Sequence, residues 1–201
     1  MSSELFWALL LFVLVTTFTP GPNNAMLMTT GLNFGFRRGM PHVWGVVLGF
    51  TFMVLAVGIG LGAVFQAYPV IYSVFKYAGA VYLLYLAWQI ATSGDVEEGE
   101  TRGRPIGFLE AAAFQWLNPK GWAMAVGATS AYATVADFPM NMLLIASLCG
   151  VLGILSSVTW VWFGMGLKHL VTSPRAIRFV NYTMAVLLVA SLWPIFAEAW
   201  R

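Results

Sequence analysis

Long apolar stretches dominate this chain and limit what it can fold into. They cover residues 5–30, 41–66, 70–91, 108–134, 140–167 and 176–199. Each reaches the roughly 20 residues that a helix needs to cross about 30 Å of hydrocarbon. Only 9% of the 201 residues are charged, against about 25% in a typical soluble domain. The sequence therefore predicts an all-α polytopic membrane protein with six transmembrane helices.

The basic residues between the predicted helices indicate the orientation of the chain. The first, third and fifth connections contain Arg37, Arg38, Arg102, Arg104, Lys168, Arg175 and Arg178. The other side has Lys76 and Arg201. Because basic residues accumulate in cytoplasmic loops, we expect the odd-numbered connections in the cytoplasm and both termini outside it.

The two halves of the chain match in the positions of their prolines. Pro20 lies 99 residues before Pro119, and the same offset places Pro41 on Met140, where the second and fifth spans open. Each half has an odd number of spans, so the second must enter the membrane from the opposite side. Inverted repeats with interrupted helices at matching positions are typical of transporters. We expect one transporter domain, 1–201, with repeat 1 over 1–92, a cytoplasmic linker over 93–106 and repeat 2 over 107–201.

The prolines of the first and fourth spans lie within the predicted hydrocarbon layer. Leu5 to Pro20 is 15 residues, about 22 Å of helix, and Phe108 to Asn118 is 10 residues, about 15 Å. Proline removes a backbone donor, and freed backbone groups at this depth must be buried in protein or line a cavity. We therefore expect spans one and four to be broken, with hinges at Pro20, Gly21, Pro22, Pro119 and Gly121.

Polar side chains beside these breaks predict a binding site. Lys120 is a cation near the midplane, which costs about 2.5–3.5 kcal/mol on insertion scales, and a substrate carboxylate is its natural partner. The free N–H groups of a half-helix N-terminus suit the same carboxylate. The predicted substrate-binding residues are Asn23, Asn24, Gln115, Asn118 and Lys120.

Each of these features also has a purely structural explanation. Simple proline kinks, with asparagines bonding the freed backbone groups, would need the same residues. Lys120 would then cap carbonyls of the broken first helix or extend toward the interface. Gln115 would join two helices, and the glycines of the second span, Gly45 and Gly49, would permit close helix packing rather than substrate clearance.

The remaining polar side chains are expected to have structural roles. His42 and His169 lie at the edges of predicted spans, where an interfacial position is expected and proton transfer is the alternative. Hydroxyl groups of the fifth span should bond backbone carbonyls within that span; they belong to Ser156, Ser157 and Thr159.

Three blocks of the sequence resemble the LysE/RhtB family of bacterial amino-acid exporters. They are "TPGPNNAMLMTTGLNFGFRRGMPHVWGVVLGF" (19–50), "KYAGAVYLLYLAWQIATS" (76–93) and "FQWLNPKGWAMA" (114–125). The resemblance covers nearly the whole chain, including its length and the central hydrophilic loop. It implies efflux of amino acids or close metabolites across the bacterial inner membrane, driven by an ion or proton gradient, with both termini periplasmic.

The resemblance also implies a neutral substrate. Family members that export basic amino acids have acidic residues in the second span and shortly after the second Asn-Pro, where this chain has Gly49 and Met124. A cationic side chain would therefore meet no buried carboxylate. The segment "AWQIATS" and the following loop are most similar to the branch that exports cysteine and O-acetylserine.

The predicted function is export of small neutral amino acids of the cysteine, O-acetylserine, threonine or homoserine type. We expect alternating access and proton antiport, with Lys120 or the substrate itself carrying the proton. The expected partners are the amino-acid substrate and the lipid bilayer, without nucleic acid or cofactor, and Gly-rich faces suggest a homodimer.

Other functions fit the sequence less well. A metal-ion or other small-solute exporter of the same broader superfamily is the alternative, but metal transport needs carboxylate, His or Cys ligands in the membrane, and no metal site is predicted. Enzymatic activity is not expected, since no acid pair or His beside a nucleophile is found. The single cysteine, Cys149, excludes an intramolecular disulfide and is expected to be a packing residue.

Overall fold

A computed structural model describes residues 3–61, 67–92, 96–97, 100–101, 103–170, 173–190 and 192. Within these residues the protein is helical apart from one short hairpin, in which β1 (Val96–Glu97) pairs antiparallel with β2 (Glu100–Thr101). The predicted all-helical class is therefore confirmed, with this hairpin in the linker as a small departure. The ends of the predicted spans 41–66 and 176–199 lie partly outside the described residues.

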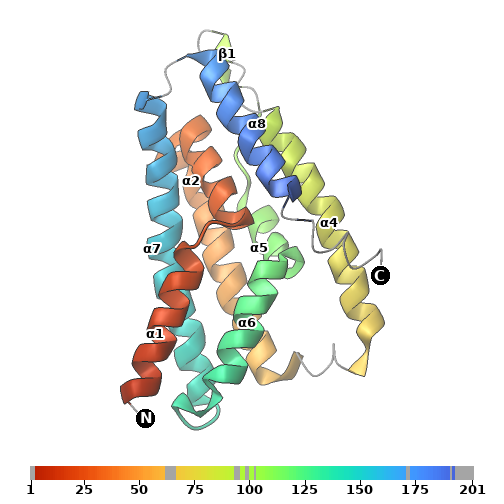
Figure 1. Cartoon of the computed structure of the whole chain (residues 1–201), viewed down its shortest axis with the longest axis vertical. Helices are drawn as coiled ribbons and strands as arrows, with labels where there is room; N and C mark the ends of the chain where they lie inside the picture. The colour runs from red at the N-terminus through yellow and green to blue at the C-terminus, as the bar shows by residue number, and fades with distance from the viewer. Residues whose placement is uncertain are drawn as a thin grey trace.

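The first apolar stretch forms two successive helices. α1 (Ser3–Phe18) rises from the N-terminus, and α2 (Pro22–Ala56) begins about halfway up the bundle (Figure 1). Pro22 occupies the first turn of α2, where its missing N–H has no intrahelical partner to lose. Gly21, the preceding residue, has an extended backbone.

α2 folds back on itself at Gly35. The φ of Gly35 is +75°, a left-handed value that favours glycine. Thr30 Oγ1 and His42 Nδ1 lie 2.9 Å apart, whereas residues this far apart in a straight helix would be separated by about 18 Å. The two arms of α2, residues 22–34 and 36–56, therefore pack side by side (Figure 1). The connection between them is one residue long rather than a loop.

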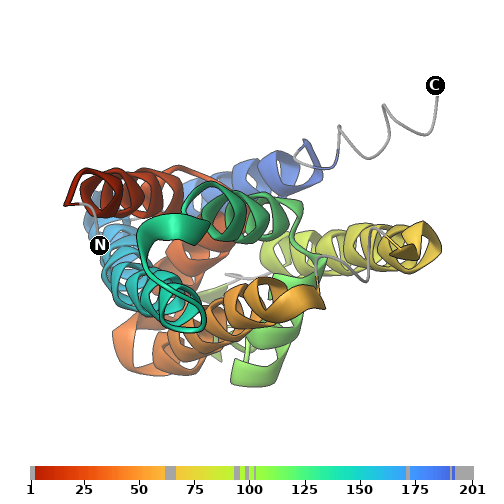
Figure 2. The same ribbon diagram turned by 90° about the horizontal axis from the view of Figure 1, so that it is seen from below.

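The remaining elements continue the up-and-down course of the chain, with α4 at the edge of the bundle (Figures 1 and 2). They are η1 (Val57–Leu61), α4 (Pro69–Ala91), α5 (Phe108–Leu117), α6 (Pro119–Ala131), η2 (Ala133–Val135), α7 (Met140–Leu170) and α8 (Pro174–Ala190). We call the end where α2 folds back and α7 finishes the upper end. The N-terminus lies at the lower end (Figure 1).

A single residue, Asn118, separates α5 from α6. Its backbone is extended (φ −88°, ψ 109°), and its side chain accepts a hydrogen bond of 3.1 Å from the backbone N–H of Lys120. Asn118 is therefore the N-cap of α6, and Pro119 occupies the first turn.

Buried apolar side chains form two clusters. The upper cluster joins the two arms of α2 to α4, α5, α7 and α8 and includes Leu27, Val43, Leu83, Phe114 and Val161. The lower cluster joins α1 to the second arm of α2, α6 and α7 and includes Leu9, Met53, Trp122, Ile145 and Cys149. Each end of the bundle therefore has its own cluster of packed apolar side chains.

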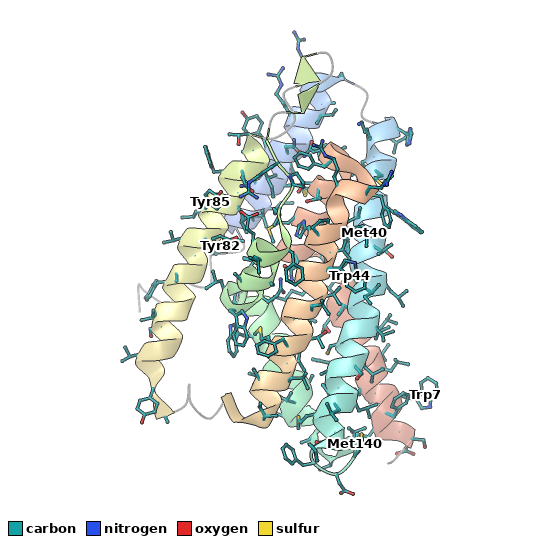
Figure 3. The ribbon with its side chains drawn as sticks, turned by 180° about the vertical axis from the view of Figure 1, so that it is seen from behind. Trp7, Met40, Trp44, Tyr82, Tyr85 and Met140 are labelled. Atoms are coloured by element: carbon teal, nitrogen blue, oxygen red, sulfur yellow. The ribbon has the colours of Figure 1, made fainter. Side chains whose placement is uncertain are left out.

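The outer surface of the bundle is also apolar. Trp7 is 64% exposed and Met140 62%, and both point away from the helices, as does Trp44 (Figure 3). Among the described residues, the stretches 22–60 and 140–170 are long and apolar enough to cross a membrane. A bundle with apolar residues both inside and outside is expected to contact lipid.

Basic residues gather at the upper end, in the fold of α2, the linker and the α7–α8 connection. They are Arg37, Arg38, Arg104, Lys168, Arg175 and Arg178. Glu97, Glu100 and Glu110 lie in or beside the linker at the same end, whereas Glu4 and Asp137 belong to the lower end. Among the described residues it is thus the basic side chains that gather at one end of the bundle.

Glycines of α2 are used for packing within the chain. A Cβ on Gly45 would overlap the carbonyl group of Phe108, and one on Gly49 would lie 2.7 Å from the Cα of Ala112. Both glycines thus permit close approach of α5. Because these faces are covered within the chain, they give no support to the predicted homodimer.

Candidate functional site

A cavity of about 50 Å³ lies where the upper and lower clusters meet. Its polar lining residues are Thr16, Thr17, Asn23, Asn24, Asn118, Lys120, Ser156 and Ser157. Its other walls are Val46, Val47, Phe50, Met124, Cys149, Gly21, Gly121 and Gly153. Two helix junctions adjoin this cavity: residues 19–21 between α1 and α2, and Asn118 between α5 and α6.

The predicted site residues lie close together. Asn23, Asn24, Asn118 and Lys120 line the cavity, as do the predicted hinge residues Gly21 and Gly121. Gln115 is outside the lining but is hydrogen-bonded to Asn23, which lines the cavity. Pro20, Pro22 and Pro119 are outside the lining. Substrate binding by any of these residues stays a prediction.

Lys120 bonds to the end of the first helix. Its Nζ donates to the backbone carbonyl of Thr19 at 2.5 Å, the capping contact that the sequence analysis gave as an alternative to carboxylate binding. Gly21 makes space for this side chain, because a Cβ there would lie 2.9 Å from Lys120 Cδ and 3.1 Å from Nζ. The ammonium therefore faces both the cavity and α1.

Two further side chains bond the carbonyls at the end of α1. Asn24 Nδ2 donates to the carbonyls of Thr17 and Thr19, both at 2.9 Å. Ser156 Oγ, from α7, donates to Thr17 at 2.8 Å. The sequence analysis expected Ser156 to bond within its own helix, as Thr159 does to Leu155. The contact of Ser156 with α1 depends on tertiary structure and has no local sequence signal.

Asn23 and Gln115 form a reciprocal amide pair between α2 and α5. Asn23 Nδ2 donates to Gln115 Oε1 at 2.8 Å, and Gln115 Nε2 donates to Asn23 Oδ1 at 3.1 Å. Gln115 Nε2 also donates to the carbonyl of Ala111 at 2.8 Å. Gln115 thus joins two helices, one of its two predicted roles.

The lining of the cavity combines two chemically different kinds of group. The polar part includes an ammonium group, amides and the N-terminus of α6, which has partial positive charge. The apolar part includes Val46, Val47, Phe50 and Met124. Among the lining residues Lys120 is the one with a charged side chain, so the cavity has no carboxylate in its wall.

His42 is buried, contrary to its predicted interfacial position. Its side chain has 0% exposure. Nδ1 is hydrogen-bonded to Thr30 Oγ1, and Nε2 has no partner within the described part of the chain. The fold-back at Gly35 brings Thr30 onto His42, which is why sequence spacing alone did not reveal this burial.

These features define a helical, multi-pass membrane protein with a polar cavity at its helix junctions. Residues 14–191 match the family described as LysE type translocator, and the chain belongs to this family. The family resemblance found in the sequence is thereby confirmed.

The chain is also similar to curated efflux proteins of enteric bacteria. It is 32% identical over 191 residues to the cysteine/O-acetylserine efflux proteins of Salmonella typhi and Salmonella typhimurium (strain LT2), covering 92% of both chains. The identity to the protein of that name in Escherichia coli (strain K12) is 32% over 187 residues, with the same coverage. No solved structure matches the chain.

Proposed function

We propose that this protein is a secondary transporter that exports small neutral amino acids or close derivatives from the cytoplasm. The observation that carries the proposal is the mixed lining of the cavity at the helix junctions, with a cation and amides beside apolar side chains. A zwitterion with a short neutral side chain has groups that match both kinds of lining. The names of the efflux relatives favour cysteine and O-acetylserine as the first substrates to test.

The proposed topology has six spans in two inverted repeats. Span one combines α1 with the first arm of α2, span two is the second arm, and span four combines α5 with α6; α4, α7 and α8 are the others. Repeat 1 is 1–92 and repeat 2 is 107–201. The basic upper end supports a cytoplasmic linker and periplasmic termini.

In this proposal the substrate exchanges partners with Lys120. The substrate carboxylate would bind the Lys120 ammonium and the N-terminus of α6. The substrate ammonium would take the place on the Thr19 carbonyl that Lys120 Nζ now occupies, while Asn24 keeps its bond to the same oxygen. Binding would thus replace one ammonium–carbonyl bond by another and add an ion pair.

The walls of the cavity favour a neutral side chain. Met124, at one of the positions where the family resemblance implies an acid in exporters of basic amino acids, lines the cavity. Gly49, at the other such position, packs against α5 instead. A substrate side chain would contact Val46, Phe50 and Met124, which offer no counter-ion for a cation.

The two apolar clusters suit alternating access. The upper cluster lies toward the basic end of the bundle and the lower cluster toward the N-terminal end, and both contribute residues to the cavity wall. Loading from the cytoplasm would require the upper cluster to part, and release would require the lower one to part. Rocking of one repeat against the other about a central site would achieve this.

The test is transport by the purified protein in liposomes with labelled cysteine, O-acetylserine, threonine, leucine and lysine. We expect export of at least one neutral compound, loss of that export in Lys120→Met, and normal export in Lys168→Met, which removes an exposed lysine at the upper end. Transport of lysine alone, or normal transport by Lys120→Met, would contradict the proposal.

A further inference from the structure

We propose that His42 carries the proton that couples export to a proton gradient. This inference rests on the proposed function and adds to it a named coupling residue. The sequence left two carriers open, Lys120 and the substrate itself, and Lys120 is bonded to Thr19 and assigned to the carboxylate in the proposed function.

The imidazole of His42 is held by one nitrogen and left open at the other. When Nδ1–H donates to Thr30 Oγ1 at 2.9 Å, Nε2 carries a lone pair inside an apolar environment. A buried polar atom without a partner is unfavourable and rare in folded proteins. A nitrogen that must accept a proton during each transport cycle explains why this position keeps an unpaired imidazole nitrogen.

The position of His42 connects the cavity to the upper end. His42 lies one helical turn from Val46, which lines the cavity, and next to Val43 of the upper cluster. Thr30 is on the opposite arm of α2. A proton that enters the cavity from outside is therefore about one turn, or roughly 6 Å along the helix, from the imidazole.

Charges near His42 are already paired. Glu110 on α5 is an acidic residue close enough to act electrostatically on His42. Its two carboxylate oxygens accept hydrogen bonds from Arg104, each at 2.6 Å. One of them also accepts the backbone N–H of Gly107 at 2.8 Å. A proton on His42 would thus add a positive charge that no free carboxylate neutralises.

That charge would couple protonation to the opening of the molecule. An unpaired imidazolium within an apolar cluster is strongly unfavourable, so protonation would favour parting of the upper cluster and hydration of His42. Release of the proton to the cytoplasm would restore the neutral imidazole and let the cluster close over a loaded substrate. One proton would enter for each amino acid exported.

The experiment separates substrate movement from proton movement in liposomes. Counterflow of labelled substrate at equal pH on both sides needs no net proton transfer. Accumulation driven by an imposed pH gradient, and the internal pH change reported by a trapped dye, both need it. We expect His42→Gln to retain counterflow and to lose both proton-dependent signals.

Two variants serve as controls. His169→Gln removes an exposed imidazole near the upper end and should behave as the unmodified protein. Thr29→Val removes a buried hydroxyl of the same arm that bonds the carbonyls of Ala25 and Met26 and not His42, so it should remain coupled. His42→Asn, which can still bond to Thr30, replaces His42→Gln if the latter does not fold.

Each result has a definite meaning. Normal proton coupling in the His42 variants, or loss of counterflow from a correctly folded variant, would overturn the carrier role. Counterflow without any proton flux in the unmodified protein would overturn it too, while leaving the exporter intact. Absence of counterflow with every neutral amino acid would instead contradict the proposed function.

Discussion

Lys120 Nζ donates to the backbone carbonyl of Thr19, which lies 101 residues earlier in the chain. This bond joins the first turn of α6 to the residue that follows α1. The same ammonium lines the cavity. A substrate that binds Lys120 would therefore alter a contact between the two halves of the molecule, which is how binding could be linked to their relative movement.

Gly21→Ala should weaken substrate binding through Lys120. The backbone of Gly21 is extended (φ −176°), so alanine fits the conformation, but its Cβ would lie 2.9 Å from Lys120 Cδ. A displaced ammonium would no longer meet the substrate carboxylate, and a charge-assisted contact of this kind contributes about 1.5–3 kcal/mol, so its loss corresponds to roughly a tenfold to hundredfold rise in the KM for export.

The control for this prediction is Gly166→Ala, because a Cβ at Gly166 meets nothing within 4 Å. Export kinetics and thermal unfolding in detergent would be measured for both variants. An unchanged KM in Gly21→Ala would mean that the position of Lys120 does not matter for binding.

The amide pair of Asn23 and Gln115 should be energetically coupled. Gln115 has 0% exposure. Asn23→Ala therefore leaves the buried Oε1 of Gln115 without its donor, which costs about 1–3 kcal/mol, while Nε2 keeps its bond to the carbonyl of Ala111. A double-mutant cycle with Gln115→Ala measures the pair itself, and contacting residues give interaction energies of about 0.5–3 kcal/mol.

Thermal unfolding and the KM for export would be measured for the unmodified protein, the two single variants and the double variant. Coupling in stability alone assigns the pair to helix packing, whereas coupling in KM as well assigns it to the substrate site. Additive single effects on stability would show that the pair does not stabilise the protein.

Much of the architecture could be predicted from composition and hydropathy, because apolar stretches long enough to span a bilayer restrict the chain to helices. The reversal of α2 at Gly35 falls within the predicted connection between the first two spans, 31–40, which also contains Arg37 and Arg38. Which residues this reversal brings together depends on how the two arms of α2 pack against each other. For this reason the burial of His42 against Thr30 was missed.

The candidate site was harder to predict than the fold. The polar residues near Pro20 and Pro119 were predicted to form a site because polar groups are unfavourable in the membrane interior. Several of them do line one cavity. The sequence alone could not decide whether Lys120 caps a carbonyl or binds a carboxylate, because the answer depends on where Thr19 lies in the folded chain. Ser156 was missed because its partner, Thr17, is on a distant helix.

Gly164→Ala should destabilise the protein without touching the cavity. A Cβ on Gly164 would overlap the carbonyl group of Met28, so α7 and the first arm of α2 would have to separate. Overpacking of this kind costs about 1–3 kcal/mol. A lower thermal midpoint with an unchanged KM is expected, and equal stability to Gly166→Ala would show that the helices can adjust.

Met124→Asp should move the substrate preference toward cations. Met124 lines the cavity, and among the described lining residues Lys120 is the one with a charged side chain. A carboxylate there would supply the counter-ion that a lysine side chain lacks in the unmodified protein, because opposite charges attract strongly in a site with little water. We expect labelled lysine to become a substrate and export of the neutral compounds to fall.

Met124→Asn is the matched control, because it adds polarity at this position without charge. If both variants transported lysine, cavity polarity rather than charge would set the preference. If Met124→Asp lost all transport while remaining folded, the acid would have paired with Lys120 instead of the substrate. Adding Lys120→Met to Met124→Asp tests that outcome through stability, since a larger fall in the thermal midpoint than Lys120→Met causes in the unmodified protein would identify the internal ion pair.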